Sequence, residues 1–178
     1  YNKISTHFSK PVRHSATNLM NESDNLTAEL FVKSIGALDT LPGTWEVGLD
    51  SMKSFLAKEV LIDTSNIRLA DGSGVSRYNL TSAAQLNSLL RWMYNSKYKD
   101  DFISTLPGGG QSNSTLEKRL TNEGDLVKAK TGGLSGVRNL AGYLKSRKYG
   151  DVAFSILMNG YTDSSSRYTR IHDQIVKT

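Results

Sequence analysis

The sequence predicts an α+β fold in which helices come first and a small antiparallel sheet with a closing helix follows. Apolar residues recur at helical spacing up to about residue 93. Three strand-like segments then follow a glycine run at 107–110, and a last helical pattern ends the chain. With 178 residues and no repeat or linker, we expect residues 1–178 to belong to one domain.

The first elements are a short strand and two helices. Apolar and polar residues alternate over 1–9, which favours a strand, and Pro11 then opens a helix or a turn. A helical pattern over 16–38 is interrupted by Ser23-Asp24-Asn25, three residue types that favour caps and turns. The sequence therefore predicts two helices that meet at this triplet, with Asp24 or Asn25 capping the second.

The middle of the chain contains a turn at 41–43 and a helix capped by Thr44 that runs towards Val60. A short strand is expected at 67–70, and the two glycines of 71–74 predict a tight turn. Thr81 or Ser82 is expected to cap a further helix whose inner face holds Leu86, Leu89, Leu90 and Met93.

The second half reads as loop, sheet and helix. Residues 107–110 predict a flexible loop, and 116–120 one or two helical turns. Strands are expected at 126–131, 137–145 and 152–159, with Gly150-Asp151 as the hairpin turn between the last two. A helix is expected from about 164 to 176.

Composition excludes several classes of function. The absence of cysteine excludes disulfides, thiolate zinc sites and a cysteine nucleophile. The three histidines are far apart and show no metal-ligand spacing, so we expect no metal and no cofactor. The net charge is +5, but the basic residues are scattered, which argues against a nucleic-acid partner and suits an anionic wall polymer.

Two short motifs point to chemistry. Lys130-Thr131-Gly132, followed by Gly133, offers a fixed cation, a hydroxyl and a strand edge free of side chains, which together suit a peptide with a terminal carboxylate. Taken alone, the Lys130-Thr131-Gly132 triplet is equally compatible with an ordinary strand end that has no role in chemistry. Ser23 and Asn25 offer a hydroxyl for proton relay and an amide for a carbonyl, although Ser23-Asp24-Asn25 alone also suits a helix cap.

The order of the two motifs is more specific. Ser-Asp-Asn at a helix junction and Lys-Thr-Gly on a strand about a hundred residues later is the order of penicillin-interacting serine enzymes. Over about 5–161 the sequence resembles the class C, type-4 penicillin-binding proteins, which are D-alanyl-D-alanine carboxypeptidases/endopeptidases with large inserted domains. The matching segments are Asn21–Glu29, Pro42–Trp45, Asp71–Leu80, Lys128–Leu134 and Val137–Tyr143.

This resemblance implies a β-lactamase/transpeptidase-like fold and a place on the periplasmic or extracellular face of the bacterial envelope. It implies peptidoglycan stem peptides and β-lactam antibiotics as partners. Ser23 would shuttle a proton towards the leaving group, and Asn25 would hold the substrate carbonyl and help position the general-base lysine. Lys130 would supply positive potential and assist proton transfer.

The remaining implied roles concern substrate binding. Thr131 would bind the terminal carboxylate of D-Ala or of a β-lactam, and Gly132 would leave room for the peptide. The backbone N–H of Gly133 would be one oxyanion donor. Arg77 would contact an acidic group of the peptide side chain, although it also suits a surface arginine after a turn.

One motif of that family is missing. No Ser-x-x-Lys precedes Ser23, and Ser96-x-x-Lys99 lies after it on a polar helix end, as a chance match would. We therefore expect the C-terminal portion of a longer protein, inactive alone, whose remainder carries the nucleophile and the inserted domains. Two alternatives stay open: a non-catalytic penicillin-binding-fold module that binds wall peptide or a protein partner, and a β-lactamase.

Overall fold

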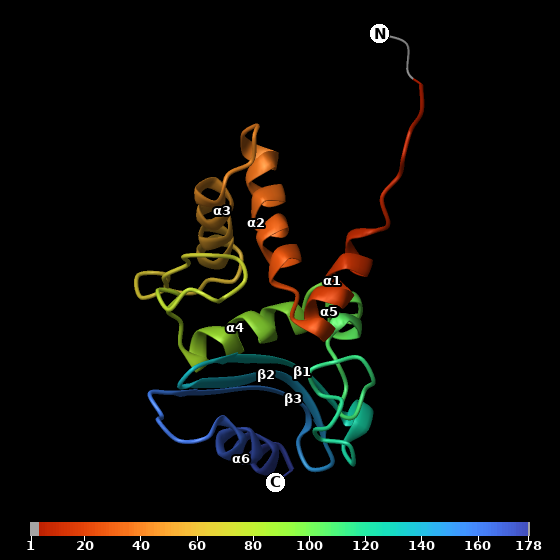
Figure 1. Cartoon of the computed structure of the whole chain (residues 1–178), viewed down its shortest axis with the longest axis vertical. Helices are drawn as coiled ribbons and strands as arrows, with labels where there is room; N and C mark the ends of the chain where they lie inside the picture. The colour runs from red at the N-terminus through yellow and green to blue at the C-terminus, as the bar shows by residue number, and fades with distance from the viewer. Residues whose placement is uncertain (1–3, 178) are drawn as a thin grey trace.

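A computed structural model describes residues 4–177, which form six α-helices and a three-stranded antiparallel sheet (Figure 1). In the view of Figure 1 the α2–α3 pair stands above α4, the sheet lies below α4, and α6 lies below the sheet. This confirms the predicted α+β architecture, with its small sheet and closing helix. The element bounds are α1 Val12–Glu22, α2 Asn25–Asp39, α3 Trp45–Lys58, α4 Ala83–Tyr94, α5 Lys99–Thr105, β1 Val127–Leu134, β2 Val137–Ser146, β3 Gly150–Asn159 and α6 Ser165–Lys177.

The predicted helix junction is confirmed. Helix α1 ends at Ser23, which adopts the left-handed conformation with φ 61° and ψ 45°. Asp24 caps α2 and accepts hydrogen bonds from Leu26 N (3.1 Å) and from the hydroxyl of Thr27. The strand expected over 1–9 is wrong for 4–9, where the exposed chain has no neighbouring strand to pair with, and residues 1–3 lie outside the described residues.

Helix α3 packs closely on α2. Thr44 caps α3 as predicted and accepts from Val47 N at 3.3 Å. Gly48 lets the two helices approach, because a Cβ at this position would lie 2.0 Å from the carbonyl oxygen of Val32. Helix α4 begins with a capping box in which Ser82 and Gln85 exchange hydrogen bonds, so the predicted cap is Ser82.

Two short elements differ from expectation. The strand predicted at 67–70 is reduced to one bridge between Arg68 and Leu80, because the flanking turns leave no room for a longer ladder. Helix α5 was not predicted, since its seven residues are too few for a clear apolar period.

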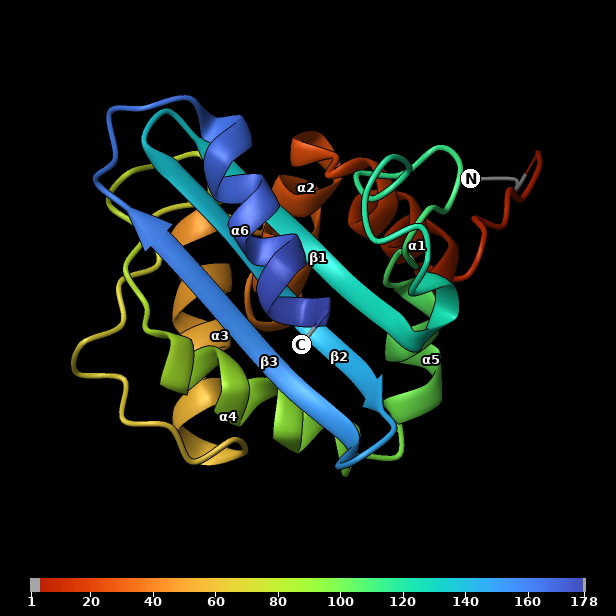
Figure 2. The same ribbon diagram turned by 90° about the horizontal axis from the view of Figure 1, so that it is seen from below.

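The sheet has the order β1-β2-β3, with register pairs such as Thr131 with Leu140 and Leu140 with Ile156. Leu140 and Val127 form a core with Val176 of α6, and Figure 2 shows α6 lying across this face of the sheet. Tyr143 projects from the opposite face, and its hydroxyl donates to the carbonyl of Leu90 on α4 at 2.8 Å. All three predicted strands are confirmed, with longer bounds.

The turn between β2 and β3 lies before the predicted Gly150-Asp151. Residues 147–149 form it, and Gly150 and Asp151 already pair with β2 as the first residues of β3. Gly150 has φ +72°, a conformation that glycine adopts without strain, which is why it follows the turn directly.

The glycine run at 107–110 was predicted as a flexible loop and is instead packed. Pro107 is fully buried, and Gly109 N donates to the carbonyl of Gly124 at 3.0 Å. A Cβ at Gly109 would lie 2.1 Å from the carbonyl oxygen of Leu120, so the packing demands glycine there. The helical turns expected at 116–120 are irregular turns, and Leu120 at their end has φ 52°.

Candidate active site

The two sequence motifs meet in one hydrogen bond. The Nζ atom of Lys130 donates to the Oγ atom of Ser23 at 2.5 Å, across 107 residues of sequence. It also donates to the carbonyl oxygen of Thr131 at 2.8 Å. Because Ser23 Oγ accepts from the lysine, its own proton is free to be donated elsewhere. The pair can therefore pass a proton from Lys130 through Ser23 to a third group.

Lys130 is partly buried between β1 and the α1–α2 junction. Burial lowers the pKa of its ammonium from 10.5 to about 8, because the charged form loses hydration. No carboxylate among residues 4–177 forms an ion pair with it. The site thus holds a cation that titrates close to neutral pH and has no acidic partner within the described chain.

Strand β1 is an edge strand, and only its first half is covered. Ala129 N donates to the carbonyl of Pro107 at 3.1 Å, away from β2. Backbone groups alternate along a strand, so the N–H groups of Thr131 and Gly133 point to the same open side. No described residue pairs with this part of the edge. A peptide in extended conformation can add there as a further strand.

The predicted substrate-binding residues flank this edge. Lys130 and Gly132 project from the sheet face that also carries Tyr143, and Thr131 and Gly133 project from the face that meets α6. A Cβ at Gly132 would meet only the side chain of Asn139, at 3.4 Å. The open backbone edge therefore lies between the ammonium of Lys130 and the hydroxyl of Thr131.

Asn25 and Arg77 are placed less tightly. Asn25 is the first residue of α2, exposed, and its side chain makes no hydrogen bond to another described residue. Arg77 is exposed, and its Nη2 donates to the carbonyl of Ser135 in the β1–β2 turn at 2.8 Å. The structure thus joins Ser23 to Lys130 directly and anchors Arg77 beyond the far end of the open edge, just after Gly133.

The loop that carries Arg77 is held by carboxylates. Glu29 on α2 accepts from Gly72 N (3.1 Å) and Ser73 N (2.9 Å) and also from the indole N–H of Trp45 (2.9 Å). Burial raises the pKa of Glu29, but these hydrogen bonds outweigh it and leave the pKa below its ordinary value. An ionised Glu29 therefore fixes the loop on α2, and Gly74 turns it with φ +78°, as predicted.

A second support was not found from the sequence. The side chain of Gln111 accepts from Gly108 N at 3.0 Å and donates to Oδ1 of Asn21 at 3.1 Å. The carbonyl of Asn21 accepts from Thr115 N at 3.0 Å. Gly108 forms a bridge with Lys128 on β1. Gln111 thus links the strand that carries Lys130 to the helix end that carries Ser23.

The Ser-x-x-Lys spacing of Ser96 and Lys99 serves local structure. Ser96 Oγ donates to the carbonyl of Met93 at 2.8 Å, at the end of α4. The ammonium of Lys99 lies over the ring of Tyr94, 3.5 Å from its centroid. Neither side chain contacts Ser23 or Lys130, so the structure is consistent with a chance match.

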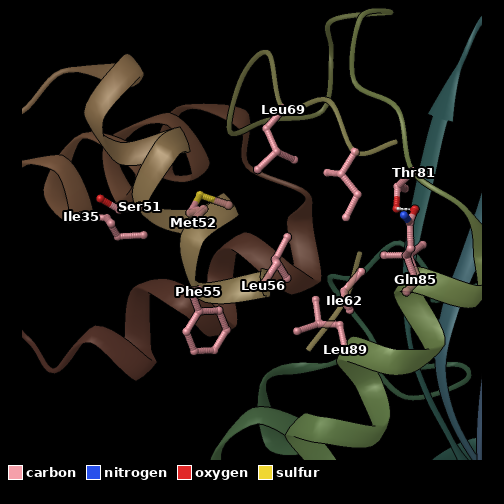
Figure 3. Close-up of a pocket in the computed structure, with 12 residues that line it drawn as sticks. Ile35, Ser51, Met52, Phe55, Leu56, Ile62, Leu69, Thr81, Gln85 and Leu89 are labelled. Atoms are coloured by element: carbon pink, nitrogen blue, oxygen red, sulfur yellow. Dashed lines mark hydrogen bonds between the residues drawn. The ribbon is translucent and has the colours of Figure 1, made fainter. Parts of the chain in front are cut away.

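A large apolar cavity of about 480 Å³ lies between the α2–α3 pair and α4 (Figure 3). Figure 3 shows Met52, Leu56, Ile62 and Leu89 pointing towards it from three different segments. Among the described residues that line it, Ser51, Thr81 and Gln85 are the polar ones. A cavity of this size and character is suited to apolar side chains.

The Lys130–Ser23 hydrogen bond lies beside an open strand edge, on an antiparallel sheet covered by helices, and comparisons with solved structures identify this arrangement as a penicillin-binding fold. The chain belongs to the D-Ala-D-Ala carboxypeptidase 3 (S13) family, whose sequence model matches residues 2–178. It is 35% identical over 165 residues to the D-alanyl-D-alanine carboxypeptidase of Actinomadura sp. strain R39, covering 89% of this chain and 30% of that protein. It is 32% identical to D-alanyl-D-alanine carboxypeptidase DacB of Haemophilus influenzae, covering 89% of this chain and 34% of that protein.

Solved structures agree with this assignment. Penicillin binding protein 4 of H. influenzae, in complex with a β-lactam, superposes with a TM-score of 0.85 at 28% identity and covers 96% of this chain and 42% of that one. The TLA-3 extended-spectrum β-lactamase, at 20% identity and a TM-score of 0.65, shows the fold alone; 93% of this chain and 62% of that one are covered. The chain spans about a third of the length of the curated relatives it matches. Within residues 4–177, no helix is long and apolar enough to cross a membrane.

Proposed function

We propose that the whole protein is a serine-type D-Ala-D-Ala carboxypeptidase/endopeptidase that acts on peptidoglycan stem peptides through an acyl-enzyme. The observation that supports this most strongly is the 2.5 Å hydrogen bond from Lys130 to Ser23 beside the open edge of β1. β-Lactams, which have a carboxylate and a strained amide, would acylate the same site. A location on the periplasmic or extracellular face of a bacterial envelope suits such a substrate.

In the proposed acylation step, the serine of a Ser-x-x-Lys motif attacks the carbonyl carbon of the penultimate D-Ala with its oxygen and gives its hydroxyl proton to the lysine of that motif, the general base. The amide C–N bond breaks, and the leaving amine takes the proton of Ser23 Oγ, which Lys130 replaces. The N–H of Gly133 would stabilise the oxyanion, and Thr131 would bind the terminal carboxylate. Asn25, exposed and without a side-chain partner among the described residues, would hold the substrate carbonyl.

The attacking serine would belong to a Ser-x-x-Lys motif outside these 178 residues. No such motif precedes Ser23, and the hydroxyl of Ser96 donates to the carbonyl of Met93 at the end of α4. The apolar cavity between α3 and α4 supports this proposal. A further helix of the same protein, packed there by its apolar side chains, would bring a nucleophile into the helical layer. The residues described here would then be the proton-relay and carboxylate-binding side of a shared site, and 1–178 a partial domain.

Labelling with fluorescent penicillin tests the proposal. We expect covalent labelling of the full-length protein, on a serine outside this chain, and at least a hundredfold slower labelling of Ser23→Ala. We expect no labelling of the isolated 178-residue chain. A label on a serine of the isolated chain would refute the shared-site proposal, and an unlabelled full-length protein that binds stem peptide would favour the non-catalytic module. Rapid release of the label as hydrolysed penicillin would favour a β-lactamase.

A further inference from the structure

Gly133 and Arg138 are paired residues on β1 and β2, and the side chain of Arg138 reaches over the glycine. A Cβ built on Gly133 would lie 2.1 Å from Nη1 of Arg138 and 3.1 Å from its Cζ. The guanidinium therefore occupies the space that a side chain on Gly133 would fill. Because Gly133 is exposed and lies on the edge strand, the guanidinium reaches the uncovered part of β1.

This guanidinium has no acidic partner among residues 4–177. Within the described residues, its side chain makes one hydrogen bond, a long one of 3.3 Å from Nη1 to the carbonyl of the neighbouring Val137. Among residues 4–177, three arginines are ion-paired: Arg13 with Asp101 at 2.6 Å, Arg119 with Asp173 at 2.7 Å and Arg167 with Asp163 at 2.9 Å. A partly buried guanidinium without an anion is a site for one, since its planar fork matches a carboxylate.

The position fits one particular carboxylate. Residues 131, 133, 138 and 140 share the sheet face towards α6, so Arg138 lies one residue pair along from Thr131 on the same face. Arg77 is different, because its Nη2 already donates to the carbonyl of Ser135 in the turn. We propose that Arg138 binds the C-terminal carboxylate of the peptide that lies along the open edge of β1, together with Thr131.

This inference rests on the proposed peptidase function and makes it more specific. Arg138 is then a specificity-determining residue that favours scissile bonds followed by a residue with a free carboxylate over those followed by a residue whose carboxyl is an amide.

The test compares the cleavage of two peptides by the full-length protein. One is diacetylated Lys-D-Ala-D-Ala with a free carboxylate, and the other is the same peptide as its C-terminal carboxamide. For Arg138→Met, which keeps the apolar stem, we expect kcat/KM on the free acid to fall roughly tenfold to a hundredfold, mainly through KM. On the carboxamide we expect a change of less than about twofold. Arg138→Lys should recover part of the loss, because it restores the charge without the fork.

Arg147→Met, in the exposed β2–β3 turn, is the matched control and should leave kcat/KM unchanged for both peptides. Equal losses on acid and carboxamide, or no loss on either, would overturn the assignment of Arg138 while leaving the peptidase function intact. The same holds if the unmodified protein shows no preference for the free acid. If the unmodified protein cleaves neither peptide and takes up no penicillin, the proposed function fails and the role of Arg138 with it. Should Arg138→Met not fold, Arg138→Lys against the same peptide pair decides.

Discussion

Replacing Lys130 by methionine should increase stability at neutral pH while it abolishes the proton relay. The ammonium is partly buried with a pKa near 8, against 10.5 for an exposed lysine. Below pH 8 the folded protein must hold a charged form that the unfolded chain solvates better, and this cost disappears as the pH rises from 8 to 10.5. From these two pKa values the cost is about 3 kcal/mol at pH 7 and about 1 kcal/mol at pH 9.5.

Methionine removes that cost and also the two hydrogen bonds to Ser23 and Thr131, which contribute about 1 kcal/mol each. We therefore expect Lys130→Met to be more stable than the unmodified protein by about 1 kcal/mol at pH 7 and less stable by about 1 kcal/mol at pH 9.5. The stability difference changes by about 2 kcal/mol between the two pH values, and this change does not depend on the free energy that the hydrogen bonds contribute.

Urea unfolding of the full-length protein and the variant at both pH values measures this difference. Lys148→Met, in the exposed β2–β3 turn, is the matched control for removal of one positive charge. A stability difference between Lys130→Met and the unmodified protein that stays constant from pH 7 to 9.5 would refute the reasoning, because it would mean that Lys130 has the same pKa folded and unfolded.

Further predictions concern the relay and the elements around it. The rate of acylation by penicillin should fall as pH rises through about 8, where Lys130 loses the proton it supplies to Ser23; a rate that stays flat to pH 9.5 would contradict this. Gln111→Ala should slow acylation roughly tenfold, because it removes the hydrogen bonds that link β1 to the end of α1. Gln85→Ala is the control and should not slow acylation, because the side chain of Gln85 also makes two kinds of hydrogen bond but lies at the start of α4. Burial and the nearby Arg119 lower the pKa of His172 on α6, so stability should be full above about pH 6.5 and fall as pH drops below it; in His172→Leu, urea unfolding should show that this dependence is lost. Ser23→Gly and Ser23→Ala should lose acylation equally, but the glycine variant should be more stable by about 1 kcal/mol, because only glycine adopts φ 61° without strain.

The elements that the sequence predicted best are those with a local cause. The caps of α2, α3 and α4 follow from a side chain and a backbone N–H two or three residues away, so Asp24, Thr44 and Ser82 could be read from the sequence alone. The strands could be predicted because each packs one face on α6 or α4, which gives its sequence apolar residues at strand spacing. The turn before β3 was misplaced by a few residues, since a glycine with positive φ can stand within a turn or directly after it.

What the sequence could not predict depends on contacts between distant segments. The run at 107–110 has the composition of a flexible loop, and only its contacts with β1 and with the turns of 116–124 show that it is a rigid support. Gln111 and Asn21 are 90 residues apart and belong to no motif. Arg138 was seen only as part of a family-like segment, because its role depends on the register of β1 and β2, which pairs it with Gly133.

The conformation of Ser23 explains why the site needs these distant supports. A serine at φ 61° is strained by an amount on the order of 1–3 kcal/mol, and it persists only where its neighbours fix it. Asn21 is held by Gln111 and Thr115 on one side, and Asp24 caps α2 on the other. Glycine would relieve the strain but has no hydroxyl, so the relay requires both the serine and the bonds that hold it. The Lys130–Ser23 hydrogen bond is thus a consequence of two helix ends and one loop fixed against β1, and substitutions in that loop should affect the chemistry before they affect the fold.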